Sequence, residues 1–511
     1  MKYAIALIFL FSCRGKQSAD LIVHHARIYT VDSAFSTAEA MAVKDGRILA
    51  TGSDADILGR YTAPVVTDLG GKAVYPGFID AHSHFVGYGE SLFMASLFGS
   101  TSDSDMVARV KQFADAHPGM AWIRGRGWDQ NKFPGAAFPD NTLLNQVFPS
   151  TPVVLGRVDG HALLANAKAL GVAGVRPGQK VDGGVIGTSN GRLTGIMIDN
   201  AMQLVYRRIP PLTPDGFLER AVAAEGRCFA QGLTTVADCG LDKAAILTLD
   251  SLQKAGKLRM RIYAMVSDSR DDLDYFIPKG PYKTDLLYVN AVKAYADGAL
   301  GSRGACLLAP YSDRPGVYGY LLHPVAHYDS LAARLAPTAW QLCTHAIGDS
   351  GNRMILNVYA RHLPGRNDRR WRVEHAQVIS VDDFSLFGRF SIIPSVQPTH
   401  ATSDMYWAGE RLGPVRLPSA YAYQRLLAQN GWLPLGTDFP VEDISPFKTF
   451  LAAVFRVDAK GFPPGGFQPS DALSRMQAIR GMTIWAARAD FLENEIGSLE
   501  AGKRADFVVL D

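Results

Sequence analysis

Two histidines stand one residue apart in the stretch FIDAHSHF, residues 78–85. Residues i and i+2 of a β-strand point to the same face, so His82 and His84 would project together if this stretch ends a strand. Such imidazole pairs are good ligands for zinc and similar divalent metals. An isolated H-x-H pair is weak evidence, because two polar residues at a sheet edge would give the same pattern.

Four further residues with suitable chemistry lie at or near the ends of later apolar runs. They are Lys293 in VNAVKAYADG, His345 in QLCTHAIGD, His375 in RVEHAQ and Asp438 in WLPLGTDFP. Each alone has a simpler explanation, as a salt-bridged lysine, a hydrogen-bonded histidine or a turn aspartate. Their joint placement at strand ends predicts a metal site, because such clusters of ionisable groups usually mark sites.

The lysine is the unusual member of this set, because an ammonium group cannot bind a cation. A buried lysine can lose its proton, and the free amine of Lys293 could then take up CO2 to form a carbamate. The two oxygens of a carbamate could bridge two divalent ions, for which zinc is the expected metal. The residues leave open whether one ion or two are bound.

The elements that would position these residues alternate between strand and helix. Eight apolar or β-branched runs recur, at residues 74–84, 233–240, 261–268, 289–298, 341–349, 372–377, 391–397 and 432–440. The clearest helix lies between the first two, where Thr213 can cap, Pro214 suits the first helical position and Gly232 suits the end. This alternation predicts an α/β fold, a (β/α)8 TIM barrel with catalytic groups at the C-terminal ends of its strands.

A long insertion follows the first strand, from about residue 87 to 211, with strands and helices of its own. Inserts of this kind often shape the substrate pocket. Its candidate substrate-binding residues are Arg126, which could hold a carboxylate or carbonyl, Trp128, which could stack, and His161, which could donate a hydrogen bond. Arg126 and Trp128 could equally stabilise the insertion. Ser302 and Arg303, just after the lysine strand, are further candidates.

The two ends of the chain have β character. The runs DLIVHHARIYTVD and AMAVKDGRILATGS contain a Lys-Asp-Gly turn that indicates a hairpin, and IGSLEAGKRADFVVLD closes the chain. We therefore expect residues 20–75 and 491–511 to form one composite β-sandwich flanking a barrel domain of residues 76–490.

The N-terminus resembles an export signal. MKYAIALIFLFSC has one lysine and an apolar run too short to span a bilayer, and LFSC resembles a bacterial lipobox. We expect residues 1–19 to be a signal peptide or lipoprotein tether, lipidated at Cys13, in an exported protein that is periplasmic or membrane-anchored. The alternative is a buried first strand with Cys13 as an inert thiol.

Composition narrows the choice of partners. The 511-residue chain has a net charge of +3 and no strongly basic or acidic run, which argues against nucleic acid. Its other cysteines are scattered without metal spacing, and Cys239 and Cys343 are expected in the core. The expected partner is a small-molecule substrate, the only membrane contact would be an N-terminal lipid anchor, and the oligomeric state, a homodimer included, is left open.

Several long motifs resemble the amidohydrolase superfamily: PGFIDAHSH, HAIGD, EHAQ, GTDFPV and GSLEAGKRADFVVLD. GRGWDQNKFP, RVDGHALLANAKAL and VKAYADGALGSRGA are similar to its YtcJ-like branch, amidohydrolase family 3, which includes N-substituted formamide deformylases. The resemblance implies that His82, His84 and Asp438 bind a first metal, that His345 and His375 bind a second, and that carbamylated Lys293 bridges them. Members of the family usually continue beyond ADFVVLD, so we expect the C-terminal part of the sandwich to be truncated.

These residues favour a metal-dependent hydrolase of a non-peptide C–N bond, of amide or N-substituted formamide type. A metal-activated hydroxide would attack the carbonyl, while Asp438 accepts a proton and returns it to the leaving nitrogen. Two alternatives remain, a metal-dependent esterase or lactonase and a ligand-binding surface lipoprotein without turnover. A deaminase fits less well, because such sites generally use one metal and would leave Lys293 without a role.

Overall fold

The computed structural model describes residues 15–511, in two compact units. The described part of unit 1 comprises residues 15–77 and 492–511, and unit 2 comprises residues 78–491. The N-terminal apolar run and Cys13 lie outside the described residues, so export and lipidation stay predictions. Within residues 15–511, every helix is too short or too polar to cross a membrane.

Unit 1 contains two four-stranded sheets, ordered β6-β5-β2-β8 and β24-β9-β3-β4, and a two-stranded sheet, β1-β7. The expected hairpin turn is present, with positive φ at Asp45 and Gly46, as a two-residue turn between twisted strands requires. The last strand pairs antiparallel with β9, so the two ends of the chain share one sheet. The elements of unit 1 are β1 Gln17–Ser18, β2 Leu21–His24, β3 Arg27–Tyr29, β4 Thr37–Ala38, β5 Ala40–Lys44, β6 Arg47–Gly52, α1 Asp54–Arg60, β7 Tyr61–Thr62, β8 Val65–Asp68, β9 Ala73–Pro76 and β24 Phe507–Leu510.

Unit 2 contains the predicted barrel, which is confirmed. Its parallel strands follow the order β10-β17-β18-β20-β21-β22-β23, and each corresponds to one of the predicted apolar runs. Almost every residue of these strands is buried, because the outer face is covered by helices and the inner face fills the barrel. The strands are β10 Phe78–Ser83, β17 Leu233–Leu241, β18 Arg261–Ser267, β20 Leu287–Tyr295, β21 Gln341–Ala346, β22 Arg372–His375 and β23 Ile393–Ser395, with β19 Tyr282–Lys283 paired to the side of β20.

The eighth predicted run, residues 432–440, is extended and closes the barrel without forming a regular strand. On one side, Gly436 N–H donates to Val396 O at 3.0 Å; on the other, Asp438 N–H donates to His82 O at 2.8 Å. The approach is so close that a Cβ on Gly436 would lie 2.5 Å from the backbone nitrogen of His82. The last segment of the barrel therefore meets the first strand directly at the predicted metal site.

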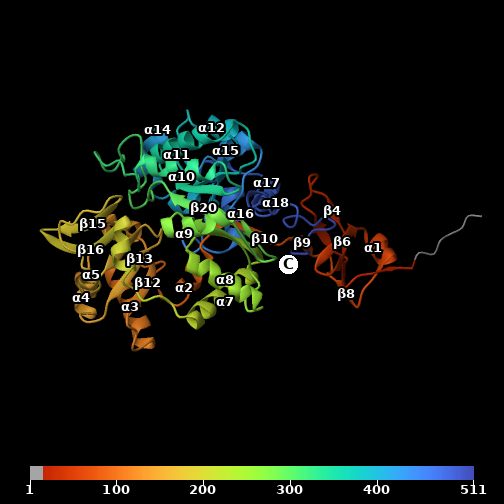
Figure 1. The fold of residues 1–511 in the computed structure, drawn as a ribbon, viewed down its shortest axis with the longest axis horizontal. Coiled ribbons are helices and arrows are strands. Elements are labelled where there is room, and N and C mark those ends of the chain that lie inside the picture. The colour runs from red at the N-terminus through yellow and green to blue at the C-terminus, as the bar shows by residue number, and fades with distance from the viewer. Residues whose placement is uncertain (1–14) are drawn as a thin grey trace, which may run out of the picture. The chain divides into compact units, whose positions relative to one another are not determined.

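Helices surround the barrel of unit 2 (Figure 1). The predicted N-terminal cap of the clearest one is observed. The Thr213 hydroxyl accepts from Gly216 N at the start of α7, and Pro214 occupies its first turn. The helices outside the insertion are α2 Phe85–Ser91, α7 Pro214–Ala230, α8 Lys243–Lys254, α9 Arg270–Phe276, α10 Val325–Leu335, α11 Asp349–His362, α12 Phe384–Arg389, α13 Pro398–Asp404, α14 Ala408–Arg416, α15 Tyr423–Asn430, α16 Pro446–Phe455, α17 Arg475–Gly481 and α18 Ile484–Ala489.

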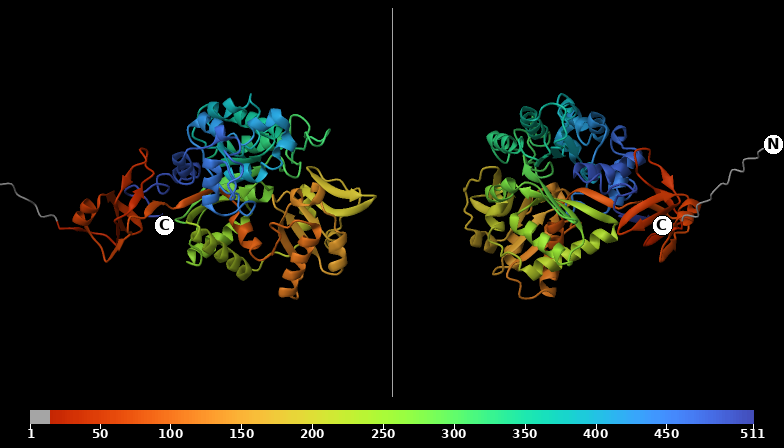
Figure 2. Two further views of the ribbon diagram at one scale, coloured as in Figure 1. Left: turned by 180° about the vertical axis from the view of Figure 1, so that it is seen from behind. Right: turned by 45° about the vertical axis from the view of Figure 1, so that its right-hand side comes forward.

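The insertion after β10 forms a lobe of unit 2, drawn orange to yellow in Figures 1 and 2. Its six-stranded sheet has the order β11-β12-β13-β14-β16-β15, and helices α3 to α5 pack on it. Its elements are β11 Ala95–Ser96, α3 Asp103–Ala116, β12 Ile123–Trp128, α4 Thr142–Val147, β13 Val153–Arg157, β14 Ala162–Ala165, α5 Ala167–Ala173, β15 Gly184–Ser189, β16 Arg192–Asp199 and α6 Gln203–Tyr206.

Candidate active site

His82 lies at the C-terminal end of β10 and is fully buried. Its Nδ1 is 2.6 Å from Glu374 Oε2. Burial would raise the pKa of Glu374, but the hydrogen bond from His82 and the nearby Arg372 and Lys293 hold it at about 2. Burial, helped by Lys293, lowers the pKa of His82 to about 4. The ring is therefore neutral with Nδ1–H donating to Glu374, which leaves the lone pair on Nε2 for a metal.

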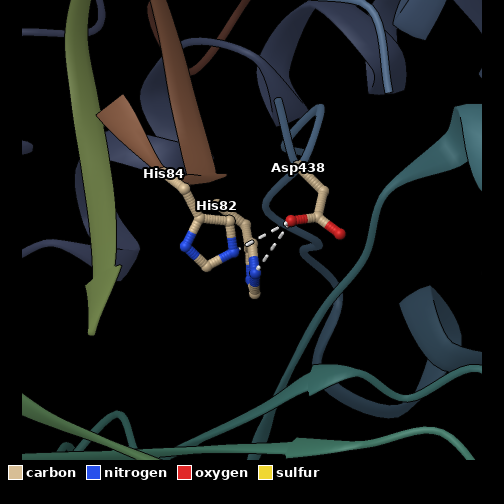
Figure 3. A group of neighbouring side chains, drawn as sticks. All are labelled: His82, His84 and Asp438. Carbon is tan, nitrogen blue, oxygen red and sulfur yellow. Dashed lines mark ion pairs between the residues drawn. The ribbon is translucent and has the colours of Figure 1, made fainter. Parts of the chain in front are cut away.

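Asp438 faces both histidines of the H-x-H pair (Figure 3). Its Oδ1 lies 3.2 Å from His84 Nε2 and 3.6 Å from His82 Nε2. One ligand atom from each of the three residues falls within 4.8 Å of the others. Asp438 has a φ of 65°, a conformation that costs energy outside glycine and that is typical of functional sites. The closing segment thus aims a carboxylate at the end of the first strand.

The other two predicted histidines join this group. The His82 and His375 ring centroids are 4.7 Å apart, and those of His375 and His345 are 4.6 Å apart. His375 has a φ of 72°, so it is strained like Asp438. Burial lowers the pKa of both His345 and His375 well below the usual value, so both rings are neutral and able to bind a metal. Imidazoles from β10, β21 and β22 therefore form one continuous cluster.

Lys293 projects from β20 into the same cavity as these ligands, and its side chain is completely buried. Burial lowers the pKa of Lys293, but Cys239, Tyr295, Glu374 and Asp438 outweigh it and leave the pKa above its usual value. The sequence suggested that burial would free this amine of its proton. Burial alone does not do so here, because the neighbouring groups outweigh it. Carbamylation of Lys293 stays a prediction.

The donor set fits a divalent cation. Four buried nitrogen atoms of this group have no hydrogen-bond partner among residues 15–511: His82 Nε2, His345 Nε2, His375 Nδ1 and Lys293 Nζ. A buried polar group left unpaired costs about 1–3 kcal/mol, so several together at one point call for a ligand. Three of the four are imidazole nitrogens, and a carboxylate lies beside them, which is the chemistry that zinc prefers.

His400 belongs to this group and is absent from the sequence predictions. It lies on α13, with Nε2 3.1 Å from Asp438 Oδ2 and Nδ1 3.2 Å from Glu442 Oε1. Burial lowers the pKa of His400, but the two flanking carboxylates raise it well above the usual value. The ring therefore donates to both and holds Asp438 Oδ2 in place. The sequence does contain a signal for His400, because it lies three residues after the seventh predicted strand, in QPTH, residues 397–400.

A cavity of about 620 Å³ is lined by the candidate metal ligands His84, Lys293, His345, His375 and Asp438. His161 of the insertion lines it as well. The His161 ring centroid is 5.0 Å from that of His345. Asp199 Oδ1 accepts from His161 Nδ1 at 2.7 Å, and Tyr320 donates to Asp199 Oδ2 at 2.7 Å. Burial lowers the pKa of His161, but Asp199 raises it above the usual value, which favours a protonated Nε2 able to donate. A Cβ on Gly298 would lie 2.6 Å from Asp199, so glycine is required for this contact.

Comparison with known proteins agrees with this geometry. The profile of the group described as "Amidohydrolase family" matches residues 65–511. The chain belongs to the amidohydrolase family. This amidohydrolase is 35% identical to Protein LONG AFTER FAR-RED 3 of Arabidopsis thaliana, over 96% of the chain and 87% of that protein. It is 31% identical to Putative amidohydrolase YtcJ of Bacillus subtilis (strain 168), over 96% and 94%.

Two further relatives bear on the chemistry of the amidohydrolase. It is 26% identical to N-substituted formamide deformylase of Arthrobacter pascens, over 97% of the chain and 94% of that protein. The crystal structure of an uncharacterized metal-dependent hydrolase from Pyrococcus horikoshii OT3 has a TM-score of 0.78 and 27% identity, over 96% and 97%. The resemblance to the YtcJ-like branch is confirmed, and the protein is a metal-dependent hydrolase of this family.

Trp128 does not reach the cavity of the amidohydrolase, contrary to the suggestion that it stacks on substrate. It is fully buried in the core of the insertion, and its indole donates to Leu155 O at 2.7 Å. Alternation would place Trp128 on the face of Arg126, but the register shifts between them at Gly127, whose φ is 110°. This bulge turns Trp128 into the core. Arg126 also stays outside the cavity lining and donates to Val158 O at 3.1 Å.

Ser302 and Arg303 are likewise placed away from the cavity lining. The Ser302 hydroxyl donates to Ala299 O at 3.3 Å, within its own turn. Arg303 pairs with Asp313 at 2.7 Å. Both stabilise the loop after β20, and an arginine that does line the cavity is Arg157, at the end of β13.

We expect Glu374→Gln to weaken metal binding by about 10- to 100-fold, the usual effect of removing a carboxylate that orients a ligating histidine. Gln cannot carry the charge that holds the His82 ring with Nε2 outward. Competition with a chelator measures the affinity. Glu225→Gln is a matched control, because buried Glu225 accepts from Arg259 N and Met260 N outside the site. Equal affinities in all three proteins would show that packing alone orients His82.

Proposed function

We propose that this amidohydrolase hydrolyses a non-peptide C–N bond, of amide or N-substituted formamide type, in a small molecule. The observation that carries the proposal is the group of buried histidine and lysine nitrogen atoms that have no hydrogen-bond partner among the described residues. They lie at a cavity large enough for a small substrate. The similarity to an N-substituted formamide deformylase over nearly the whole chain supports the choice of bond. Zinc is the metal we favour, because imidazole dominates the donor set.

The residues that would hold the metal are His82, His84, His345, His375, Asp438 and, as its carbamate, Lys293. When bound, the ion supplies Lewis acidity, which lowers the pKa of water and polarises a carbonyl. Glu374 orients His82 for this role, and His400 orients Asp438. The rings of His82, His345 and His375 are already neutral, so metal binding requires little loss of protons from these three ligands.

Asp438 is placed to move the proton. Burial would raise its pKa, but hydrogen bonds from His400 and His84 hold it well below the usual value, so the carboxylate is ionised. His400 occupies Oδ2, which leaves Oδ1 facing His82 and His84. A water in the cavity could give its proton to Oδ1, and the same atom could then pass it to the leaving nitrogen.

His161, from the insertion, lines the cavity beside His345 of the barrel. Asp199 accepts from its Nδ1, so Nε2–H is the donor left on a ring whose centroid is 5.0 Å from that of His345. A donor in this position would hydrogen-bond the substrate carbonyl and stabilise negative charge as it develops. The insertion would thus supply both the pocket wall and one polar contact to the reacting group.

The substrate class is tested with matched pairs that differ in one atom. Zinc-loaded protein is assayed with an N-alkylformamide and with the formate ester of the same alkyl group. We expect turnover of the formamide, because Asp438 can protonate an amine leaving group, which needs a proton more than an alkoxide does. Turnover of the ester or of a lactone without the amide would replace the proposal with the esterase alternative. Substrate binding without any turnover across an amide, ester and lactone panel would support the ligand-binding alternative.

A further inference from the structure

A second group of metal-type side chains lies outside the cavity lining. Asp268, His323 and His327 each place one ligand atom within 4.8 Å of the others. None of the three lines the cavity. They lie where the loop after β18 meets the segment that leads from β20 into α10.

The local sequence explains how these residues meet. Asp268 directly follows β18, and His327 lies in the first turn of α10. His323 precedes the helix by two residues, so the two histidines have the i, i+4 spacing that places side chains on one side of a turn. Their rings are 4.4 Å apart at 30°, and His327 Nε2 is 3.0 Å from Asp268 Oδ2.

The chemistry of the group matches a transition metal. Within residues 15–511 the His323 ring makes no hydrogen bond, so its ring nitrogens are available to a ligand. Asp268 and His327 side chains are 21% and 32% exposed, so a cation can enter and can keep water as a further ligand. Two imidazoles and one carboxylate select zinc-type ions over calcium or magnesium, which prefer oxygen ligands alone.

We propose that Asp268, His323 and His327 bind one divalent transition-metal ion, with zinc as the reference ion, separate from the metal centre of the cavity. The ion would join the loop after β18 to the segment before α10. The competing explanation is an ion pair between His327 and Asp268 with His323 stacked on it, which needs no metal.

This site would brace a segment that reaches the cavity. His323 N–H donates to the Tyr328 hydroxyl, which in turn donates to Tyr295 O at the end of β20. Three residues before His323, Tyr320 donates to Asp199, the partner of His161. A metal at His323 would therefore restrain the segment that supports the insertion contact, and we expect zinc to raise the unfolding temperature through this site.

Counting zinc in matched variants tests the proposal. Wild type, His323→Asn, His327→Gln and His362→Asn are dialysed to equilibrium in the same zinc buffer, and bound zinc is measured by mass spectrometry. His362 is the control, because its Nε2 lies 3.0 Å from Asp329 Oδ1, the same pairing without a second imidazole. We expect wild type and His362→Asn to hold one more zinc per chain than either of the other two, whatever the cavity holds.

Equal counts in the four folded proteins would overturn the proposal, and so would equal loss of zinc in His362→Asn. Anomalous scattering from zinc-soaked wild-type crystals decides the question without any variant. A zinc peak between His323 and Asp268 supports the site, and a peak confined to the cavity overturns it. Both readouts are independent of which bond the amidohydrolase cleaves.

Discussion

Asp438→Asn is expected to lower kcat by about 10²- to 10⁴-fold, the usual contribution of a positioned proton-transfer group. The substitution removes the charge that accepts the proton, while an amide oxygen remains beside His82 and His84. Metal should stay bound at least in part, because the histidine ligands are untouched. Steady-state kinetics at saturating zinc, with metal content measured on the same sample, separate loss of the base from loss of the ion.

Asp443→Asn is the matched control for this experiment. Asp443 lines the same cavity, but its carboxylate forms an ion pair with Lys448 and accepts a hydrogen bond from Ser445 N rather than contacting the histidines. Its variant should keep wild-type kcat and zinc content. Full activity of Asp438→Asn would rule out Asp438 as the proton acceptor.

His161→Ala is expected to lower kcat by about 10²- to 10³-fold, the effect of removing one donor to a developing oxyanion. Asp199 accepts from Nδ1 and leaves Nε2–H as the donor of a ring that lines the cavity. A developing oxyanion would accept that hydrogen bond more strongly than the ground-state carbonyl does, so we expect the loss in kcat. Zinc content should be unchanged. The measurement is kcat and KM for the substrate found with the matched pairs.

His117→Ala provides the comparison within the insertion. His117 is exposed at the end of α3, and its Nδ1 contacts Phe113 O at 2.8 Å, so the variant should behave as wild type. A kcat for His161→Ala equal to that of His117→Ala would limit His161 to supporting the insertion. A raised KM with unchanged kcat would place it in ground-state binding only.

The positions of the metal-type residues could be predicted because a parallel barrel gathers all C-terminal strand ends on one rim. His82 and Asp438 illustrate this: apolar runs identify the strands, and the polar residue at the end of each run marks the rim. Placing these residues on one rim requires only the strand ends, and it requires neither the helix boundaries nor the loop conformations. The residue types then determine the chemistry, which is why the sequence alone indicates a metal site.

The residues of the insertion could not be placed in the same way. Trp128 and Arg126 are two residues apart, and alternation predicts one face for both, but the bulge at Gly127 separates them. Gly127 permits the bulge, but Gly125 in the same strand pairs regularly with Leu155, so the sequence alone does not say where the register shifts. His400 was missed for a different reason, because it comes from the helix that follows a strand rather than from the strand end.

The closing contact of the barrel has a consequence for the lifetime of the holoprotein. Asp80 and Thr437, 357 positions apart in sequence, are hydrogen-bonded at 2.7 Å in the same seam that brings Asp438 to His82. A cation bound by ligands from both β10 and the closing segment would link the two edges of the barrel, which no covalent bond joins. Separation of the closing segment from β10 would release the ion and detach that segment in one event. Loss of the metal and loss of the barrel should therefore share a single kinetic step.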